Sequence, residues 1–164
     1  MRGLGWGVDY PAREPDSRPL SGEPMPTPPT GTILLVDDED GVRVALRRTL
    51  VAQGHTVLEA SHGAEAIAVV RMRRGNLDLV LSDVVMPEMN GTELAATLFR
   101  DYPGLPVILM SAYAPAGLTQ IGADGHKVPV LQKPFASGQL EELIQVSLEM
   151  HGRRRREARP TAAF

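Results

Sequence analysis

Apolar runs of strand length alternate with segments of helical period along most of this sequence. The runs span Thr32 to Val36, His55 to Ala60, Leu77 to Ser82, Leu105 to Ser111 and Val128 to Gln132. The first, third and fourth are apolar without alternation, as expected for strands that are covered on both faces. Strand followed by helix, five times over, predicts a doubly wound α/β fold, (βα)5, with a five-stranded parallel sheet between two helical layers.

The segments between these runs place apolar residues on one helical face. The faces consist of Val42, Ala45, Leu46 and Leu50; Ala64, Ile67, Ala68 and Met72; Leu94, Ala95 and Leu98; and Leu140, Leu143, Ile144 and Leu148. The stretch between Tyr113 and Val128 is short and contains Pro115 and three glycines. Because glycine and proline disfavour helix, we expect the fourth helix, which would lie here, to be brief or irregular.

Composition divides the chain into one domain and two tails. A chain of 164 residues suffices for one well-buried core. Half of the 14 prolines lie within the first 30 residues, which show no apolar periodicity, so residues 1–30 are predicted to be a disordered tail or linker. The basic run from Arg153 to Pro160 predicts a second disordered tail over residues 151–164. The folded domain is expected to span residues 31–150.

Charge and composition exclude several classes of function. The net charge is −3, which gives no whole-chain electrostatic argument for nucleic-acid binding, since such binding calls for a strongly basic face. There is no cysteine for disulfides or thiolate metal sites, and no apolar run approaches the roughly 20 residues that cross a membrane. The N-terminus lacks the pattern of a secretory signal. We therefore expect a cytoplasmic protein without nucleic-acid or membrane partners.

Polar residues follow the predicted strands at the points where the strands end. These residues are Asp37, Asp38 and Glu39, then Asp83, Ser111 and Lys133. The carboxyl ends of parallel strands meet at one edge of the sheet, where ligands of such folds bind. Crowded carboxylates repel one another unless a cation neutralises them, and oxygen ligands favour a hard ion such as Mg²⁺. The pattern indicates a site for metal and phosphate.

Four motifs in order carry a family resemblance: "LLVDDED" from Leu34, "SDVVMPEMNG" from Ser82, "MSA" from Met110 and "KPF" from Lys133. Over residues 31–150 they resemble the receiver domain of two-component response regulators. The resemblance implies a flavodoxin-like sheet of strand order 2-1-3-4-5, which is the order that receivers share with flavodoxin. It also implies a cis peptide bond between Lys133 and Pro134. The sequence "LQKPF" looks most like the corresponding motif of receivers attached to hybrid sensor histidine kinases.

The resemblance also implies roles for the residues at the strand ends. Asp83 would accept a phosphoryl group from a phosphohistidine on a histidine kinase or histidine phosphotransfer protein. Mg²⁺ would be bound by Asp37, Asp38, Asp83 and the backbone carbonyl of Val85. Ser111 and Lys133 would contact the phosphoryl group. The protein would be a monomer or weak dimer, and a phosphoacceptor that assists its own phosphorylation and dephosphorylation rather than an enzyme.

Other interpretations remain open at this stage. Taken alone, Asp38 or Asp40 is better explained as a helix cap, and Ser111 as a capping hydroxyl. The chain could be a pseudo-receiver that serves as an interaction scaffold, or the detached C-terminal receiver of a hybrid kinase. An aspartyl phosphatase is disfavoured, because Val85 stands where such an enzyme needs a second acid. Val130 occupies the place where receivers commonly carry a switch aromatic, which leaves the signalling surface undefined.

Overall fold

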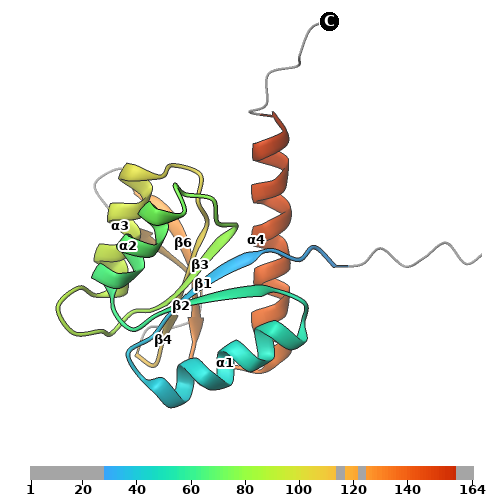
Figure 1. Cartoon of the computed structure of the whole chain (residues 1–164). Helices are drawn as coiled ribbons and strands as arrows, with labels where there is room; N and C mark the ends of the chain where they lie inside the picture. Colours follow the sequence, from blue (N-terminus) through green and yellow to red (C-terminus); the bar gives the residue numbers. More distant parts are fainter. Residues whose placement is uncertain (1–27, 114–116, 122–124, 158–164) are drawn as a thin grey trace, which may run out of the picture.

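The computed structural model describes residues 28–113, 117–121 and 125–157 (Figure 1). Its elements are β1 (Thr32–Val36), α1 (Asp40–Ala52), β2 (Thr56–Ala60), α2 (Gly63–Met72), β3 (Leu79–Asp83), α3 (Gly91–Asp101), β4 (Val107–Ser111), β5 (Gly117–Ile121), β6 (His126–Gln132) and α4 (Ser137–Glu157). The predicted disordered segment over residues 1–30 lies almost wholly outside the described residues. No helix in the described part of the chain is both long and apolar enough to cross a membrane.

The six strands form one sheet in the order β2-β1-β3-β4-β6-β5. All pairings among β2, β1, β3, β4 and β6 are parallel. These five strands reproduce the order 2-1-3-4-5 when counted along the chain without β5, so the predicted flavodoxin-like sheet is confirmed. Its parallel strands end together at one edge, which is the edge that receives the polar residues of the sequence motifs.

The sixth strand is the main departure from the predicted architecture. Residues Gly117–Ile121 form β5, which pairs antiparallel with β6, from Gly117 opposite Val130 to Ile121 opposite His126. The expectation of a brief or irregular fourth helix is therefore wrong for these five residues. The glycines do disfavour helix there, but backbone pairing with β6 provides an alternative that local propensity cannot reveal.

The last helix also extends further than expected. α4 runs from Ser137 to Glu157, so the expected domain boundary at residue 150 falls inside it. His151 is buried, and its Nδ1 lies 2.9 Å from the carbonyl oxygen of Gly104. Arg155 forms an ion pair with Asp78 at 3.2 Å. These contacts tie the final turns of α4 to the loops at the base of the sheet, while residues 158–164 lie outside the described part of the chain.

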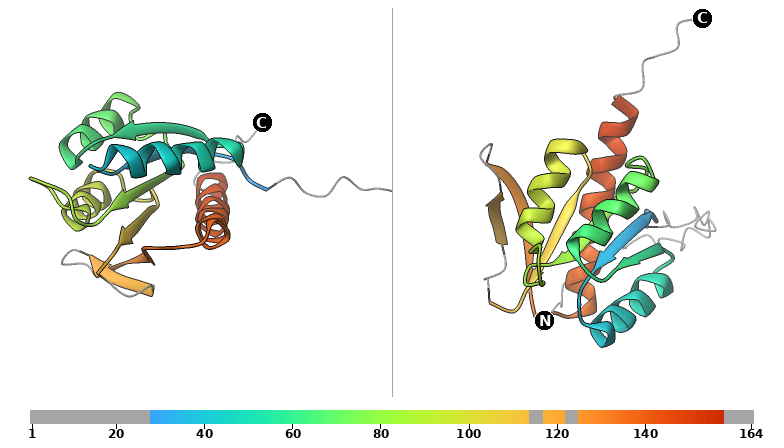
Figure 2. Two further views of the ribbon diagram at one scale, coloured as in Figure 1. Left: turned by 90° about the horizontal axis from the view of Figure 1, so that it is seen from below. Right: turned by 60° about the vertical axis from the view of Figure 1, so that its left-hand side comes forward.

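Helices cover both faces of the sheet (Figure 2). A core of buried side chains lies on each face. Side chains alternate between the faces along β1: Leu34 and Val36 join the core under α2 and α3, whereas Ile33 and Leu35 join the core under α1 and α4. All four side chains are fully buried. Because β1 is covered on both faces, its sequence is apolar without alternation, which confirms the prediction made from the uninterrupted apolar run.

Candidate functional site

The predicted polar residues gather at the carboxyl edge of the parallel strands. Asp37 directly follows β1, Asp83 and Ser111 are the last residues of β3 and β4, and Lys133 directly follows β6. Lys133 Nζ lies 3.1 Å from Asp37 Oδ2 and 3.2 Å from Asp83 Oδ1. One lysine thus links the carboxylates that end two neighbouring strands, across 96 residues of sequence in the case of Asp37.

The loop after β1 presents two aspartates in different environments. Asp37 is fully buried, and its Oδ1 accepts a hydrogen bond from the backbone N–H of Glu39 at 2.9 Å. Asp38 is exposed. The N-cap residue of α1 is Glu39, and no side chain makes the capping hydrogen bond. The alternative that Asp38 or Asp40 caps this helix therefore does not describe the observed loop.

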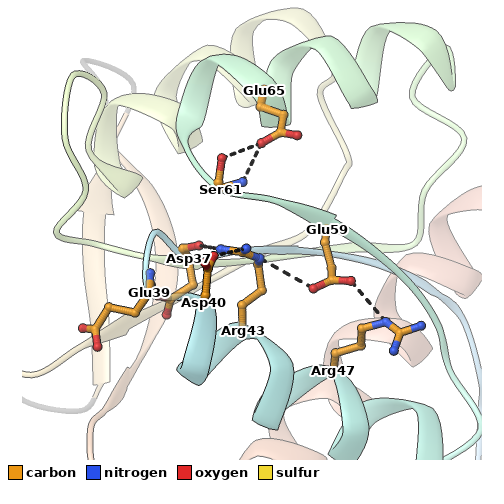
Figure 3. Close-up of polar contacts among 8 residues, drawn as sticks. All are labelled: Asp37, Glu39, Asp40, Arg43, Arg47, Glu59, Ser61 and Glu65. Carbon is orange, nitrogen blue, oxygen red and sulfur yellow. Dashed lines mark hydrogen bonds and ion pairs between the residues drawn. The ribbon is translucent and has the colours of Figure 1, made fainter.

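Arg43 stabilises this acidic loop from within α1 (Figure 3). Its Nη1 donates a hydrogen bond to the main-chain carbonyl oxygen of Asp37 at 2.6 Å, and its other guanidinium nitrogens pair with Asp40 and with Glu59 of β2. Glu59 is held in turn by Arg47, at 3.1 Å. Sequence reasoning did not identify Arg43. The only available signal was an arginine three residues after an acid, which is common on exposed helices.

Gly91 allows α3 to begin directly against the phosphoacceptor candidate. A Cβ at this position would lie 2.2 Å from the carbonyl oxygen of Asp83, and the Gly91 N–H donates to the carbonyl oxygen of Val84 at 2.8 Å. Just before it, Asn90 and Glu93 form a reciprocal capping box that starts α3. The loop between β3 and α3 is therefore closed by main-chain contact, which only a residue without a side chain permits.

The hydroxyl and lysine candidates are joined through the backbone. Ser111 is buried, its Oγ accepts from the N–H of Tyr113 at 3.1 Å, and its carbonyl oxygen accepts from the N–H of Lys133 at 2.8 Å. The peptide bond between Lys133 and Pro134 is cis, as the resemblance implied. The remaining candidate, Val85, is half exposed in the loop after β3 and is the only one whose proposed contribution is a backbone oxygen.

Burial and charge shift the ionisation of the central pair. Burial raises the pKa of Asp83, and the neighbouring Lys133 opposes this effect only in part. Burial alone would lower the pKa of Lys133, but its hydrogen bond to Asp37 and the charges of Asp37 and Asp83 outweigh burial and raise it. Lys133 therefore stays protonated and reduces the cost of holding two carboxylates at a poorly hydrated edge.

The carboxylates also fit a divalent cation. Asp37, Asp38 and Asp83 each offer one oxygen, and these oxygens all lie within 4.8 Å of one another. The set contains only oxygen donors, which suits a hard ion such as Mg²⁺, and the exposed Asp38 leaves room for the waters that Mg²⁺ usually keeps. Asp37, Asp38 and Asp83 are thus the residues that would hold such an ion.

A doubly wound sheet whose carboxyl edge carries buried aspartates, a hydroxyl and a lysine defines an α/β protein with an acidic site suited to metal and phosphate. The family model described as response regulator receiver domain matches residues 33–145. The chain belongs to this family.

Relatives with known names extend the comparison. The chain is 39% identical to the sensor kinase CckA of Brucella abortus over 120 aligned residues. The aligned region covers 73% of this chain and 13% of that protein. It is 37% identical to the response regulator MprA of Mycobacterium sp. strain KMS over 112 aligned residues. This aligned region covers 68% of this chain and 46% of that protein. The chain thus spans less than half the length of either relative.

Among solved structures, the receiver domain from the hybrid histidine kinase CckA matches at a TM-score of 0.61 and 36% identity. The match covers 72% of this chain and 99% of that structure. The likeness therefore extends over essentially a whole receiver domain, and the sequence prediction of this family is confirmed.

Proposed function

We propose that this chain is a phosphoacceptor in a two-component phosphorelay, and that Asp83 is the residue that receives the phosphoryl group. The observation that carries the proposal is the position of Asp83. It ends β3 beside Asp37, with Lys133 Nζ 3.2 Å from its carboxylate. The donor would be a phosphohistidine on a histidine kinase or histidine phosphotransfer protein, and the site of action would be the cytoplasm.

The proposed reaction transfers a phosphoryl group between two side chains. An oxygen of the Asp83 carboxylate attacks phosphorus, the bond from phosphorus to the imidazole nitrogen breaks, and the imidazole leaves with the electron pair. The product on Asp83 is an acyl phosphate. A carboxylate is a weak nucleophile, so the rate depends on placement and on stabilisation of charge rather than on a general base.

Each neighbouring residue has a part in this proposal. Bound Mg²⁺ would supply positive charge that offsets the charges of the carboxylates and of the phosphoryl oxygens. Lys133 would exchange its contact with Asp83 for a phosphoryl oxygen once Asp83 is phosphorylated. The Ser111 hydroxyl, at the end of the adjacent strand β4, would donate to another phosphoryl oxygen. The phosphoryl group is transferred to a side chain of this chain itself, so we propose a phosphoacceptor that assists its own phosphorylation and dephosphorylation and not an enzyme with turnover.

Phosphorylation can be tested with a small donor. The chain is incubated with acetyl phosphate in the presence and absence of Mg²⁺, and intact mass is measured. We expect one phosphoryl group, only with Mg²⁺, and none on Asp83→Asn. Asp101→Asn is the matched control, because it removes an exposed carboxylate at the end of α3 and should be phosphorylated like the parent. Equal labelling of Asp83→Asn would refute the assignment to Asp83, and no labelling of the parent would favour the scaffold interpretation.

Lys133 provides a second test of the same proposal. Lys133→Arg keeps the charge but replaces a compact ammonium with a wide planar group at a site that already holds two carboxylates. We expect slower phosphorylation with an unchanged fold. Lys127→Arg, at an exposed position on β6, is the matched control and should behave like the parent. Unimpaired phosphorylation of Lys133→Arg would remove Lys133 from the proposed site.

A further inference from the structure

Two adjoining hollows lie at the opposite end of the sheet from Asp83. Their volumes are about 410 and 400 Å³, and both are lined by the loop before β4 and by the C-terminal half of α4. They share the segment from Pro103 to Leu105 together with His151 and Arg154. Each volume lies within the range of small-molecule sites, about 300–1,000 Å³.

The charged side chains that line these hollows are all basic. Lys127 and Arg154 line the first hollow, while Arg74, Arg154 and Arg155 line the second. No aspartate or glutamate is among the described lining residues of either hollow. Lys127 and Arg154 make no ion pair with any residue that the structure describes. This basic concentration stands out because the whole chain has a net charge of −3.

The first hollow also has an apolar wall. The rings of Phe99 and His126 stack with their centroids 4.8 Å apart and an angle of 16° between the planes. Leu105, Val107 and Met150 add aliphatic and thioether surface beside them. A flat aromatic face next to aliphatic groups suits the apolar part of a ligand, and the arginine and lysine at the rim suit a negative group on the same ligand.

His151 supplies an independent observation. Its side chain lines both hollows and is only 9% exposed. Nδ1 lies 2.9 Å from the Gly104 carbonyl oxygen, which can only accept, so Nδ1 carries a hydrogen. Nε2 is buried and has no hydrogen-bond partner among the described residues. With the hydrogen on Nδ1, the neutral ring leaves Nε2 as an acceptor, which a donor on the ligand, such as the hydroxyl of a singly ionised phosphate group, would satisfy.

We propose that the joined hollows bind a small amphipathic organic anion, namely an apolar ring or short chain that ends in a carboxylate or phosphate. The apolar part would pack on Phe99 and His126, and the anionic end would pair with Lys127 and Arg154. The site lies at the amino ends of β4 and β6, so binding there is independent of phosphorylation at Asp83 and does not rest on that proposal.

The proposal is tested by titrating the full chain, ¹⁵N-labelled and without Mg²⁺, with phenyl phosphate. We expect saturable shifts of the amides of Gly104, His126 and His151, and none at Asp83. Inorganic phosphate and benzyl alcohol serve as separate probes of the anionic and apolar parts, and each should bind more weakly. Equal binding by inorganic phosphate, or shifts confined to other residues, would overturn the proposal.

Matched arginine variants locate the anionic end. Arg154→Ala should weaken the affinity for phenyl phosphate by about threefold, as expected for the loss of one partly exposed ion pair. Arg153→Ala is the control, because Arg153 is an exposed neighbour on the same helix and lines neither hollow. The two variants have the same charge, so equal losses would show a general effect of charge and refute a built site. A dispersed spectrum of each variant establishes that it is folded.

Discussion

Gly91 is in contact with the main chain that carries Asp83, and Gly91→Ala tests how strongly that contact matters. A Cβ built at Gly91 lies 2.2 Å from the Asp83 carbonyl oxygen, 3.0 Å from the Asp83 carbonyl carbon and 3.0 Å from the Val84 Cα. All three atoms are backbone at the end of a buried strand, so none can rotate away. The start of α3 or the end of β3 must move by about 1 Å to restore ordinary contact distances.

The expected cost follows from two opposing effects. Overpacking against a rigid surface costs about 1–3 kcal/mol, and alanine in place of glycine in a helix recovers at most about 1 kcal/mol. We therefore expect Gly91→Ala to lower the free energy of unfolding by up to about 3 kcal/mol, and by about 1–3 kcal/mol relative to a glycine-to-alanine change that meets no contact. Gly41→Ala and Gly138→Ala are the matched controls. Both glycines lie in the first turn of a helix, and a Cβ on either would meet nothing within 4 Å.

The assay is urea unfolding followed by circular dichroism, together with phosphorylation by acetyl phosphate under conditions where each variant is folded. The two control variants should be as stable as the parent or more so. Gly91→Ala should be both less stable and slower to take up the phosphoryl group, because the backbone of Asp83 has moved. If Gly91→Ala matched Gly41→Ala in both measurements, the close contact would have no energetic consequence and the reasoning would be refuted.

Three further predictions concern stability, positioning and hydrolysis. Burial lowers the pKa of His55, with Glu141 partly opposing it, so the unfolded chain binds more protons below pH 6.5. The free energy of unfolding should therefore fall as pH drops from 7 towards 5, and His55→Asn should flatten this dependence in urea titrations. Arg43→Met should lower stability by about 1–2 kcal/mol and slow phosphorylation, because the Asp37 carbonyl loses its donor. The more exposed Arg47→Met should slow phosphorylation much less. Val85 and Tyr113, which are 56% and 86% exposed, offer no carboxylate or amide to orient an attacking water. The acyl phosphate should decay slowly after donor removal, and Val85→Asn and Tyr113→Glu should accelerate its decay; a parent that decays fastest would contradict this.

The central sheet and the cluster at its edge were accessible from sequence because each depends on a simple pattern. Uninterrupted apolar runs indicated strands buried on both faces, and parallel strands must end at one edge. The sequence alone therefore predicted that Asp37, Asp83 and Lys133 lie close together. In the structure, Lys133 Nζ lies 3.1 Å from a carboxylate oxygen of Asp37 and 3.2 Å from one of Asp83. The roles of these residues in phosphoryl transfer remain predictions.

Other features depend on contacts between distant segments that no local pattern encodes. β5 exists because β6 is available to pair with it, whereas glycine content alone indicated only a poor helix. The basic end of α4 was expected to be solvated beyond the domain, but His151 and Arg155 reach Gly104 and Asp78 and keep the helix in place. Arg43 likewise could not be identified from a local pattern, because its structural role is a hydrogen bond to the main-chain carbonyl oxygen of Asp37, six residues earlier.

Because of the β5–β6 pair, the two edge strands of this sheet, β2 and β5, differ in how each can separate from its neighbouring strand. β2, at the other edge, is parallel to β1, is connected to it through α1 and contacts both α1 and α2, whereas β5 has fewer contacts with a helix, which is α3. β5 is antiparallel to β6 and directly precedes it among the strands, with Ile121 opposite His126. Such a strand can detach from its neighbour and re-form while the parallel sheet stays intact, since little loop-closure entropy is involved. The amides of β5 should therefore exchange with solvent through local opening, long before those of β1 and β3, whose exchange requires the whole domain to unfold.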